Sequence, residues 1–107
     1  MIIVTTSEIQ GKRISGYKGI VCGEVIVAPN FLKDIMASVT NFFGGRSGAY
    51  ENELLKAREE ALSELQERAA RAGANAVVGV DVKYVSIMLG TTSLLMVATS
   101  GTAVTLD

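Results

Sequence analysis

The chain has 107 residues, a formal net charge of −1 and one cysteine. This length allows a single domain spanning 1–107, and the near-neutral charge argues against nucleic-acid binding, which normally leaves a basic surface. Residues 1–8 lack the basic leader and long apolar core of a secretory signal, and the lone cysteine excludes an internal disulfide. We therefore expect a cytoplasmic protein.

Apolar residues are unusually abundant for a small domain: 49% of the chain is hydrophobic, and its mean hydropathy is +0.35. Between Ala72 and Leu106 only Asp81 and Lys83 are charged. The most apolar stretch, 85–104, is interrupted by four consecutive turn-forming or polar residues, so it falls short of the roughly 20 apolar residues that span a membrane. Exposed apolar patches usually mark interfaces, so we expect a homo-oligomer.

The first half of the chain predicts strands, a loop and a short helix. Residues 1–6 and the β-branched segment 20–28 are typical of strands, and the polar, glycine-rich segment 10–19 between them is interpreted as a loop or hairpin arm. Apolar residues recur at helical spacing within 30–43, which follows a proline. A short helix is therefore expected there, ending at the two glycines 44 and 45.

The clearest element is a long helix over about 47–72. A stripe of apolar residues recurs at steps of three and four: Tyr50, Leu54, Ala57, Ala61, Leu65, Ala69 and Ala72. Ser47 is the expected N-cap, and Gly73 suits the position just after the last turn. Glutamates precede arginines at i,i+4 spacing, as in Glu64–Arg68 and Glu67–Arg71, which supports an isolated helix by a few tenths of a kcal/mol per pair.

Two further strands follow the long helix, within 75–87 and 94–106. Strict alternation would place Val78 and Val80 on one face of the first of these, and Asp81 on the other. Gly101 indicates a bulge or bend in the second. The fold class is α+β: a β-α-β-β core with an additional N-terminal strand and a short extra helix, its curved sheet packed on the long helix. The 20–28 and 75–86 strands would be parallel if they are neighbours, and the second sheet face is where we expect subunit contacts.

Several sequence segments, taken in order, resemble the YbjQ-like family of small bacterial proteins. They are "GEVIVAPNF" (23–31), "GGRSGAYENEL" (44–54), "AREEAL" (57–62), "GANAVVGVDV" (73–82) and "GTAV" (101–104). The resemblance covers nearly the whole chain. It implies a core like that of dodecin subunits, a ring-like homo-oligomer with five copies expected, and a heavy-metal-binding label without a characterised role.

The metal label can be weighed against three residues, Cys22, Glu24 and Asp81. Soft metals prefer thiolate and imidazole ligands, and the chain offers one cysteine and no histidine, so a cysteine-based site needs several copies. Relatives tend to carry Asp-x-Asp-Tyr-Glu after "GANAVVG", whereas Lys83 and Val85 replace the later two acids here. We favour a small, buried apolar role for Cys22, and ion pairs of Glu24 or Asp81 with Lys83 or Arg46 across strands or subunits.

The glycine-rich turn at Gly45, Arg46 and Ser47 offers backbone amides at a helix start, where an anion could bind. It lacks the Gly-Lys-Ser/Thr ending of a phosphate-binding loop and is not a dinucleotide fingerprint. We favour a capping role, with Arg46 either binding an anion or bridging to a neighbouring subunit.

A histidine base is absent and no serine or cysteine stands beside a recognisable base, so no enzyme is expected. The sequence thus predicts a non-catalytic homo-oligomer of unknown role that needs no cofactor. The alternatives are a metal-binding protein using carboxylates or ring-assembled Cys22, and a small-molecule or anion binder at subunit interfaces. Neither nucleic acid nor a membrane is expected as a partner.

Overall fold

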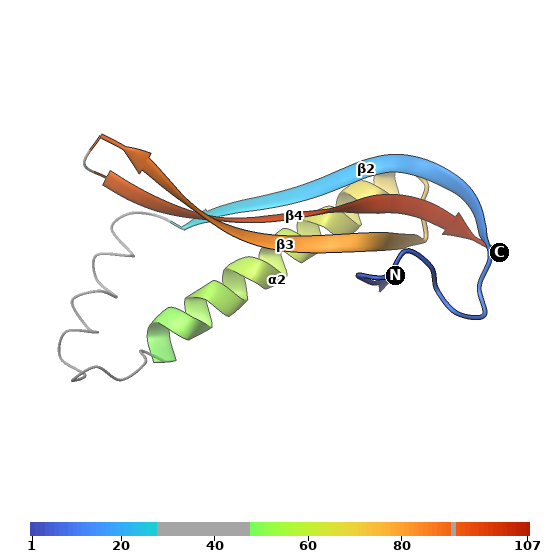
Figure 1. Cartoon of the computed structure of the whole chain (residues 1–107), viewed down its shortest axis with the longest axis horizontal. Helices are drawn as coiled ribbons and strands as arrows, with labels where there is room; N and C mark the ends of the chain where they lie inside the picture. Colours follow the sequence, from blue (N-terminus) through green and yellow to red (C-terminus); the bar gives the residue numbers. More distant parts are fainter. Residues whose placement is uncertain (28–47, 91) are drawn as a thin grey trace.

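The computed structural model describes residues 1–27, 48–90 and 92–107. Four strands and one long helix make up this part of the chain: β1 (Ile2–Ile3), β2 (Ile14–Val27), α2 (Gly48–Arg71), β3 (Ala76–Leu89) and β4 (Thr92–Leu106). The strands form one twisted sheet, and α2 lies across one of its faces (Figure 1). The predicted α+β class and the curved sheet on a long helix are confirmed. The predicted short helix at 30–43 lies outside the described residues.

The strand order in the sheet is β1-β3-β4-β2. The strands predicted at 20–28 and 75–86, here β2 and β3, are not neighbours. β4 lies between them and pairs antiparallel with both. β2 and β3 still run in the same direction. The chain crosses from β2 to β3 through α2. It then reverses direction in a tight turn at Gly90, and β4 pairs with β3 on the side that faces β2.

The helix α2 begins and ends close to the predicted limits. Its buried residues are Ala57, Ala61, Leu65 and Ala69, all members of the predicted stripe. At the C-terminal end, the amide of Gly73 donates to the carbonyl of Ala70, and the amide of Ala74 donates to that of Ala69, both over 3.0 Å. Gly73 has φ +86. This paired arrangement is a Schellman motif, which needs a left-handed residue after the last turn, and it confirms Gly73 at that position.

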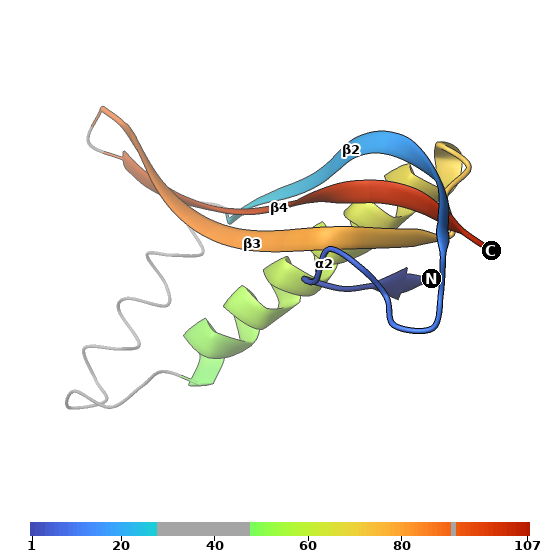
Figure 2. The same cartoon turned by 45° about the vertical axis from the view of Figure 1, so that its right-hand side comes forward.

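Helix and sheet approach most closely where β2 carries a glycine. A Cβ atom built on Gly23 would lie 2.1 Å from the carbonyl oxygen of Ala61. Beside this contact, the buried hydroxyl of Thr99 lies 3.0 Å from the Ala61 carbonyl oxygen and 3.2 Å from that of Gly23. Small residues on both elements therefore let the two backbones meet, and the hydroxyl links them. Towards its N-terminal end α2 diverges from the sheet (Figures 1 and 2).

A bulge in β3 interrupts the alternation of its side chains, so the faces predicted for residues on its two sides do not agree with the structure. Pairing with β4 is regular up to Val78 and resumes at Asp81, and Gly79 has φ +62. The inserted residue places Val80 beside Leu65 of the helix, whereas Val78 belongs to the core on the opposite face. Val78 and Val80 therefore do not share a face as predicted. The bend suggested by Gly101 is real, but it lies in β3.

The segment 10–19, predicted as a loop or hairpin arm, is a strand from Ile14 onwards, because β2 begins there and pairs with β4. Its pairing with β4 has register shifts between Ile14 and Gly16 and between Tyr17 and Gly19. The residues between β1 and β2 fold over the sheet face opposite α2, where Val4 and Ile9 pack against a buried cluster of Ala76, Val78 and Val104. In Figure 2 this N-terminal segment lies beside the start of β3. Within the described ranges, no helix is both long and apolar enough to cross a membrane.

Candidate functional site

The three predicted metal candidates share the sheet face opposite α2, which we call the open face. Strand register places Cys22, Ser100 and Asp81 in one row across β2, β4 and β3. The next row holds Glu24 beside Ala98 and Lys83. The alternation of side chains along strands keeps both rows on the face away from the helix, because Gly23 and Thr99 between them contact α2.

These residues do not fit a metal site within one copy of the chain. Cys22 and Asp81 stand on the two strands that flank β4, so their backbones are about 10 Å apart at the usual strand spacing. Ligands of one zinc ion each lie about 2.0–2.3 Å from it, which these short side chains cannot achieve across β4. Among the described residues, no three His, Cys, Asp or Glu side chains gather closely enough to hold an ion. Within its own copy, Cys22 therefore has no set of ligands for a metal ion in the described part of the chain.

Asp81 has one of its predicted partners, but the pair lies within β3 rather than across strands or subunits. Its carboxylate Oδ2 lies 3.6 Å from the Nζ atom of Lys83, two residues further along β3. Both side chains are more than half exposed, so the pair adds little to stability. Cys22 is a free, half-buried thiol. Glu24 is exposed.

The predicted anion or interface residues Gly45, Arg46 and Ser47 lie outside the described residues. Their capping and anion-binding interpretations therefore remain predictions.

Two polar side chains, Arg68 and Asn75, bind main-chain groups of β2 and of the end of β4, and neither contact was predicted from the sequence. Arg68 on α2 donates a hydrogen bond from Nη1 to the main-chain carbonyl of Cys22 over 2.7 Å. Asn75, between α2 and β3, both accepts from the amide of Leu106 at 2.8 Å and donates to its carbonyl at 3.3 Å. An asparagine directly after a helix-ending Gly-Ala pair is a usable signal for such side-chain capping. The arginine, by contrast, carries no local signal for its β2 partner.

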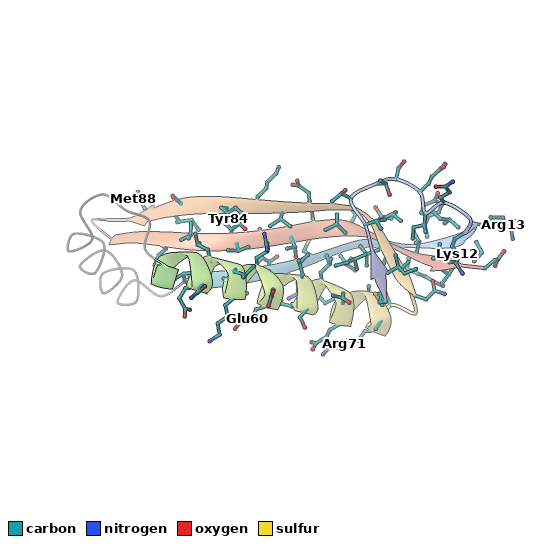
Figure 3. The ribbon with its side chains drawn as sticks, turned by 90° about the horizontal axis from the view of Figure 1, so that it is seen from below. Lys12, Arg13, Glu60, Arg71, Tyr84 and Met88 are labelled. Atoms are coloured by element: carbon teal, nitrogen blue, oxygen red, sulfur yellow. The ribbon has the colours of Figure 1, made fainter. Side chains whose placement is uncertain are left out.

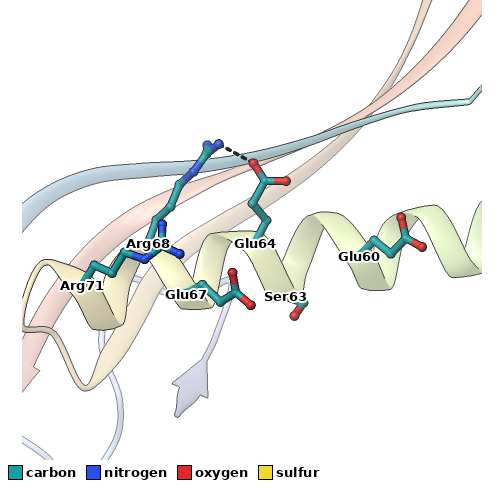
Figure 4. Close-up of a pocket in the computed structure, with 6 residues that line it drawn as sticks. All are labelled: Glu60, Ser63, Glu64, Glu67, Arg68 and Arg71. Carbon is teal, nitrogen blue, oxygen red and sulfur yellow. Dashed lines mark ion pairs between the residues drawn. The ribbon is translucent and has the colours of Figure 1, made fainter.

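The solvent side of α2 carries a shallow charged depression of about 430 Å³ (Figure 4). It is lined by Glu60, Ser63, Glu64, Glu67, Arg68 and Arg71. Arg68 and Glu64 form the predicted i,i+4 ion pair, while Glu67 and Arg71 form none within the described chain. Because every lining residue belongs to one helix and the charges are mixed, the depression presents no convergent set of ligand groups.

Large apolar side chains are exposed on the sheet. Ile20 and Ile26 of β2 are 82% and 58% exposed, and Met88 of β3 is 63% exposed. Ile26 shares an open-face row with Met96 and Val85. Figure 3 shows Tyr84 and Met88 along β3, far from Lys12 and Arg13 at the other end of the sheet. Within the described residues, most of the exposed large apolar side chains therefore lie on strands, while Leu55 of α2 is exposed as well.

Known proteins match this chain along its full length. The family model described as "Putative heavy-metal-binding" matches residues 1–107. A UPF0145 protein of Acetivibrio thermocellus is 56% identical over 107 residues, covering all of both chains. A UPF0145 protein of Pasteurella multocida is 54% identical over 104 residues, which is 97% of each chain.

A solved structure shares the fold. It is a protein of unknown function of the DUF74 family from Pediococcus pentosaceus, which aligns with a TM-score of 0.63 at 17% identity. The alignment covers 100% of this chain and 98% of that one. The full-length family match and the identities above 50% together establish that this chain belongs to the YbjQ (UPF0145) family.

Proposed function

We propose that this protein is the subunit of a non-catalytic homo-oligomer. The observation that carries the proposal is the exposure of large apolar side chains on the sheet, among them Ile20, Ile26 and Met88. Exposing several large apolar side chains on one small chain is costly, and such patches commonly mark interfaces. The family resemblance makes five copies the expected number.

The lack of catalysis in this proposal rests on the residue inventory. The sequence contains no histidine, the side chain best suited to proton transfer near neutral pH. Three pairs of charged side chains come together in the described part of the chain: Arg13 with Asp107, Glu64 with Arg68, and Asp81 with Lys83. All of them are at least partly open to solvent. The family description names a metal and no reaction.

Sedimentation velocity over a hundredfold range of protein concentration tests the proposal. We expect a single species of several copies, with a fraction of single copies only at the lowest concentration. A chain that sediments as one copy throughout would overturn it.

Metal binding across a subunit boundary is the second candidate, favoured by the common placement of Cys22, Glu24 and Asp81 on the open face. The chemistry of a thiolate with carboxylates suits Zn²⁺ or Cd²⁺. Titration of the assembled protein with Cd²⁺, followed by the ultraviolet absorption of the cadmium–thiolate bond, tests it. We expect the absorption in the native protein and its loss in Cys22→Ser. If the native protein gives no such absorption, this second candidate is wrong.

A further inference from the structure

The two strands that flank β4, β2 and β3, each have one protected half and one open half. We call the part of the sheet from the Glu24–Ala98–Lys83 row to the β3–β4 turn the distal half, and the rest the proximal half. On the proximal half, β1 and the residues after it cover the outer edge of β3: the amide of Val80 donates to the carbonyl of Val4 over 3.0 Å. On the proximal half of β2, register shifts distort the strand before Ile20, and Arg68 donates a hydrogen bond to the main-chain carbonyl of Cys22.

The distal half carries none of these devices within the described residues. β2 pairs with β4 in unbroken register from Ile20 to Val27, and β3 does so from Asp81 to Leu89. Bulges, covering segments and charged groups are how proteins prevent strand edges from pairing with other chains. Within the described residues, the bulges and the covering segment are restricted to the proximal half, and one charged side chain, Glu24 or Lys83, remains on each distal edge. Two regular edges therefore lie at the same level of the sheet, one on each side.

The unused main-chain groups of these edges can be identified from the ladder. The Cys22 carbonyl points away from β4, because Arg68 binds it there. In an antiparallel pair, inward and outward residues alternate, so Glu24 and Ile26 also present their main-chain groups outwards. On β3, the outward amide of Val80 assigns the same orientation to Tyr84 and Ser86.

We propose that the distal edge of β3 in one copy pairs with the distal edge of β2 in the next copy, so that the sheet continues from subunit to subunit. This inference rests on the homo-oligomer proposed above and names its contact surface. β2 and β3 run in the same direction, because both are antiparallel to β4. Edge pairing in register therefore gives a parallel, head-to-tail contact, which closes into a ring when the rotation between copies is right.

The charges of the two edges are complementary. Glu24 is the charged residue of the distal edge of β2, and Lys83 is that of β3; both are exposed on the open face and occupy the same row. In-register pairing places Lys83 of one copy beside Glu24 of the next. Opposite charges across an interface favour the correct register, and like charges there oppose association.

A charge swap tests this contact directly. Lys83→Glu and Glu24→Lys each place like charges in the contact, whereas the double variant restores opposite charges. Light scattering after size-exclusion chromatography gives the number of copies, and circular dichroism verifies the fold. We expect each single variant to weaken association at least tenfold and the double variant to regain the native number of copies.

A main-chain variant gives a second readout. Ser86→Pro removes an outward amide without touching the ladder to β4, and Ser86→Ala is its control. We expect fewer copies with proline and the native number with alanine. If the native chain is an oligomer and all these folded variants keep its copy number and affinity, or if the double charge variant fails to restore assembly, the edge contact is wrong while the homo-oligomer stands. A native chain found as single copies would instead overturn the proposed function itself.

Discussion

The hydroxyl of Thr99 in β4 donates to the main-chain carbonyl of Ala61 in α2 over 3.0 Å, at the point where helix and sheet are closest. Thr99 is only 2% exposed. A polar group at this depth needs a partner, and the helix supplies one because Ala61 has no side chain large enough to hold the two elements apart. This contact sets the distance at which α2 covers the sheet.

Replacing the hydroxyl by a methyl group tests how much the contact stabilises the fold. Thr99→Val keeps the shape of the side chain and removes the donor, so we expect the free energy of unfolding to fall by about 1 kcal/mol. Thr102→Val is the matched control on the same strand, because Thr102 lies on the open face and is partly exposed. Urea unfolding followed by circular dichroism measures both. Equal effects of the two variants would contradict a specific role for the Thr99 hydroxyl.

Gly23→Ala is expected to be far more damaging. Its methyl group would lie 2.1 Å from the Ala61 carbonyl oxygen, so the helix must move. We expect a loss of about 3 kcal/mol or more, at the upper end for overpacking.

Gly16→Ala is the control for that variant, because its methyl group would meet only the Thr105 hydroxyl at 2.9 Å, on a side chain that can rotate. Thermal unfolding of both variants checks the difference. A Gly23→Ala protein as stable as Gly16→Ala would show that the close approach of helix and sheet is not essential.

Arg68 makes two contacts whose effects on stability can be measured separately: an ion pair with Glu64 and a hydrogen bond to the main-chain carbonyl of Cys22. Glu64→Ala removes the ion pair but leaves the bond from Arg68 to the Cys22 carbonyl, so we expect a change within about 0.5 kcal/mol. Arg68→Ala removes both and exposes the edge carbonyl, with an expected loss of about 1 kcal/mol. Chemical unfolding of the two variants in parallel gives the comparison. The reverse order of effects would assign the role to the ion pair instead.

Asn75 is expected to hold the end of β4 in place. Asn75→Ala removes both of its bonds to the main chain of Leu106, so the amide of Leu106 should exchange with solvent about tenfold faster, which corresponds to about 1.4 kcal/mol. Asn75→Asp keeps an oxygen that accepts from the Leu106 amide, so the exchange rate of that amide should stay close to the native rate. Hydrogen exchange followed by NMR reads this position directly, and unchanged exchange in Asn75→Ala would contradict the assigned role.

The helix could be predicted from sequence to within a residue or two because its signals are local. The spacing of Ala57, Ala61, Leu65 and Ala69 reports a face that meets the sheet, and Gly73 reports the left-handed residue that ends the helix. Both depend on neighbours in the chain. Cys22 and Glu24 lie on one face of β2, as the alternation of side chains along a strand requires.

The errors come from relationships between distant residues. Gly79 forms a bulge opposite Gly101. A Cβ atom built on Gly101 would lie 2.6 Å from Cγ1 of Val77. Neither glycine alone indicates which strand bends, so the faces of Val78 and Val80 could not be assigned. The start of β2 at Ile14 was missed because Tyr17 lies exposed on an outer strand, where burial imposes no alternation. The distance from Cys22 to Asp81 depends on β4 entering between their strands, which no local pattern reports.

The most direct test of the central claim is native mass spectrometry of the gently purified chain. One spectrum gives the number of copies and any retained mass. The account predicts a multiple of the 11.3 kDa subunit, with five copies expected, and that Lys83→Glu shifts the signal towards smaller assemblies. A spectrum containing only the single 11.3 kDa chain would contradict it.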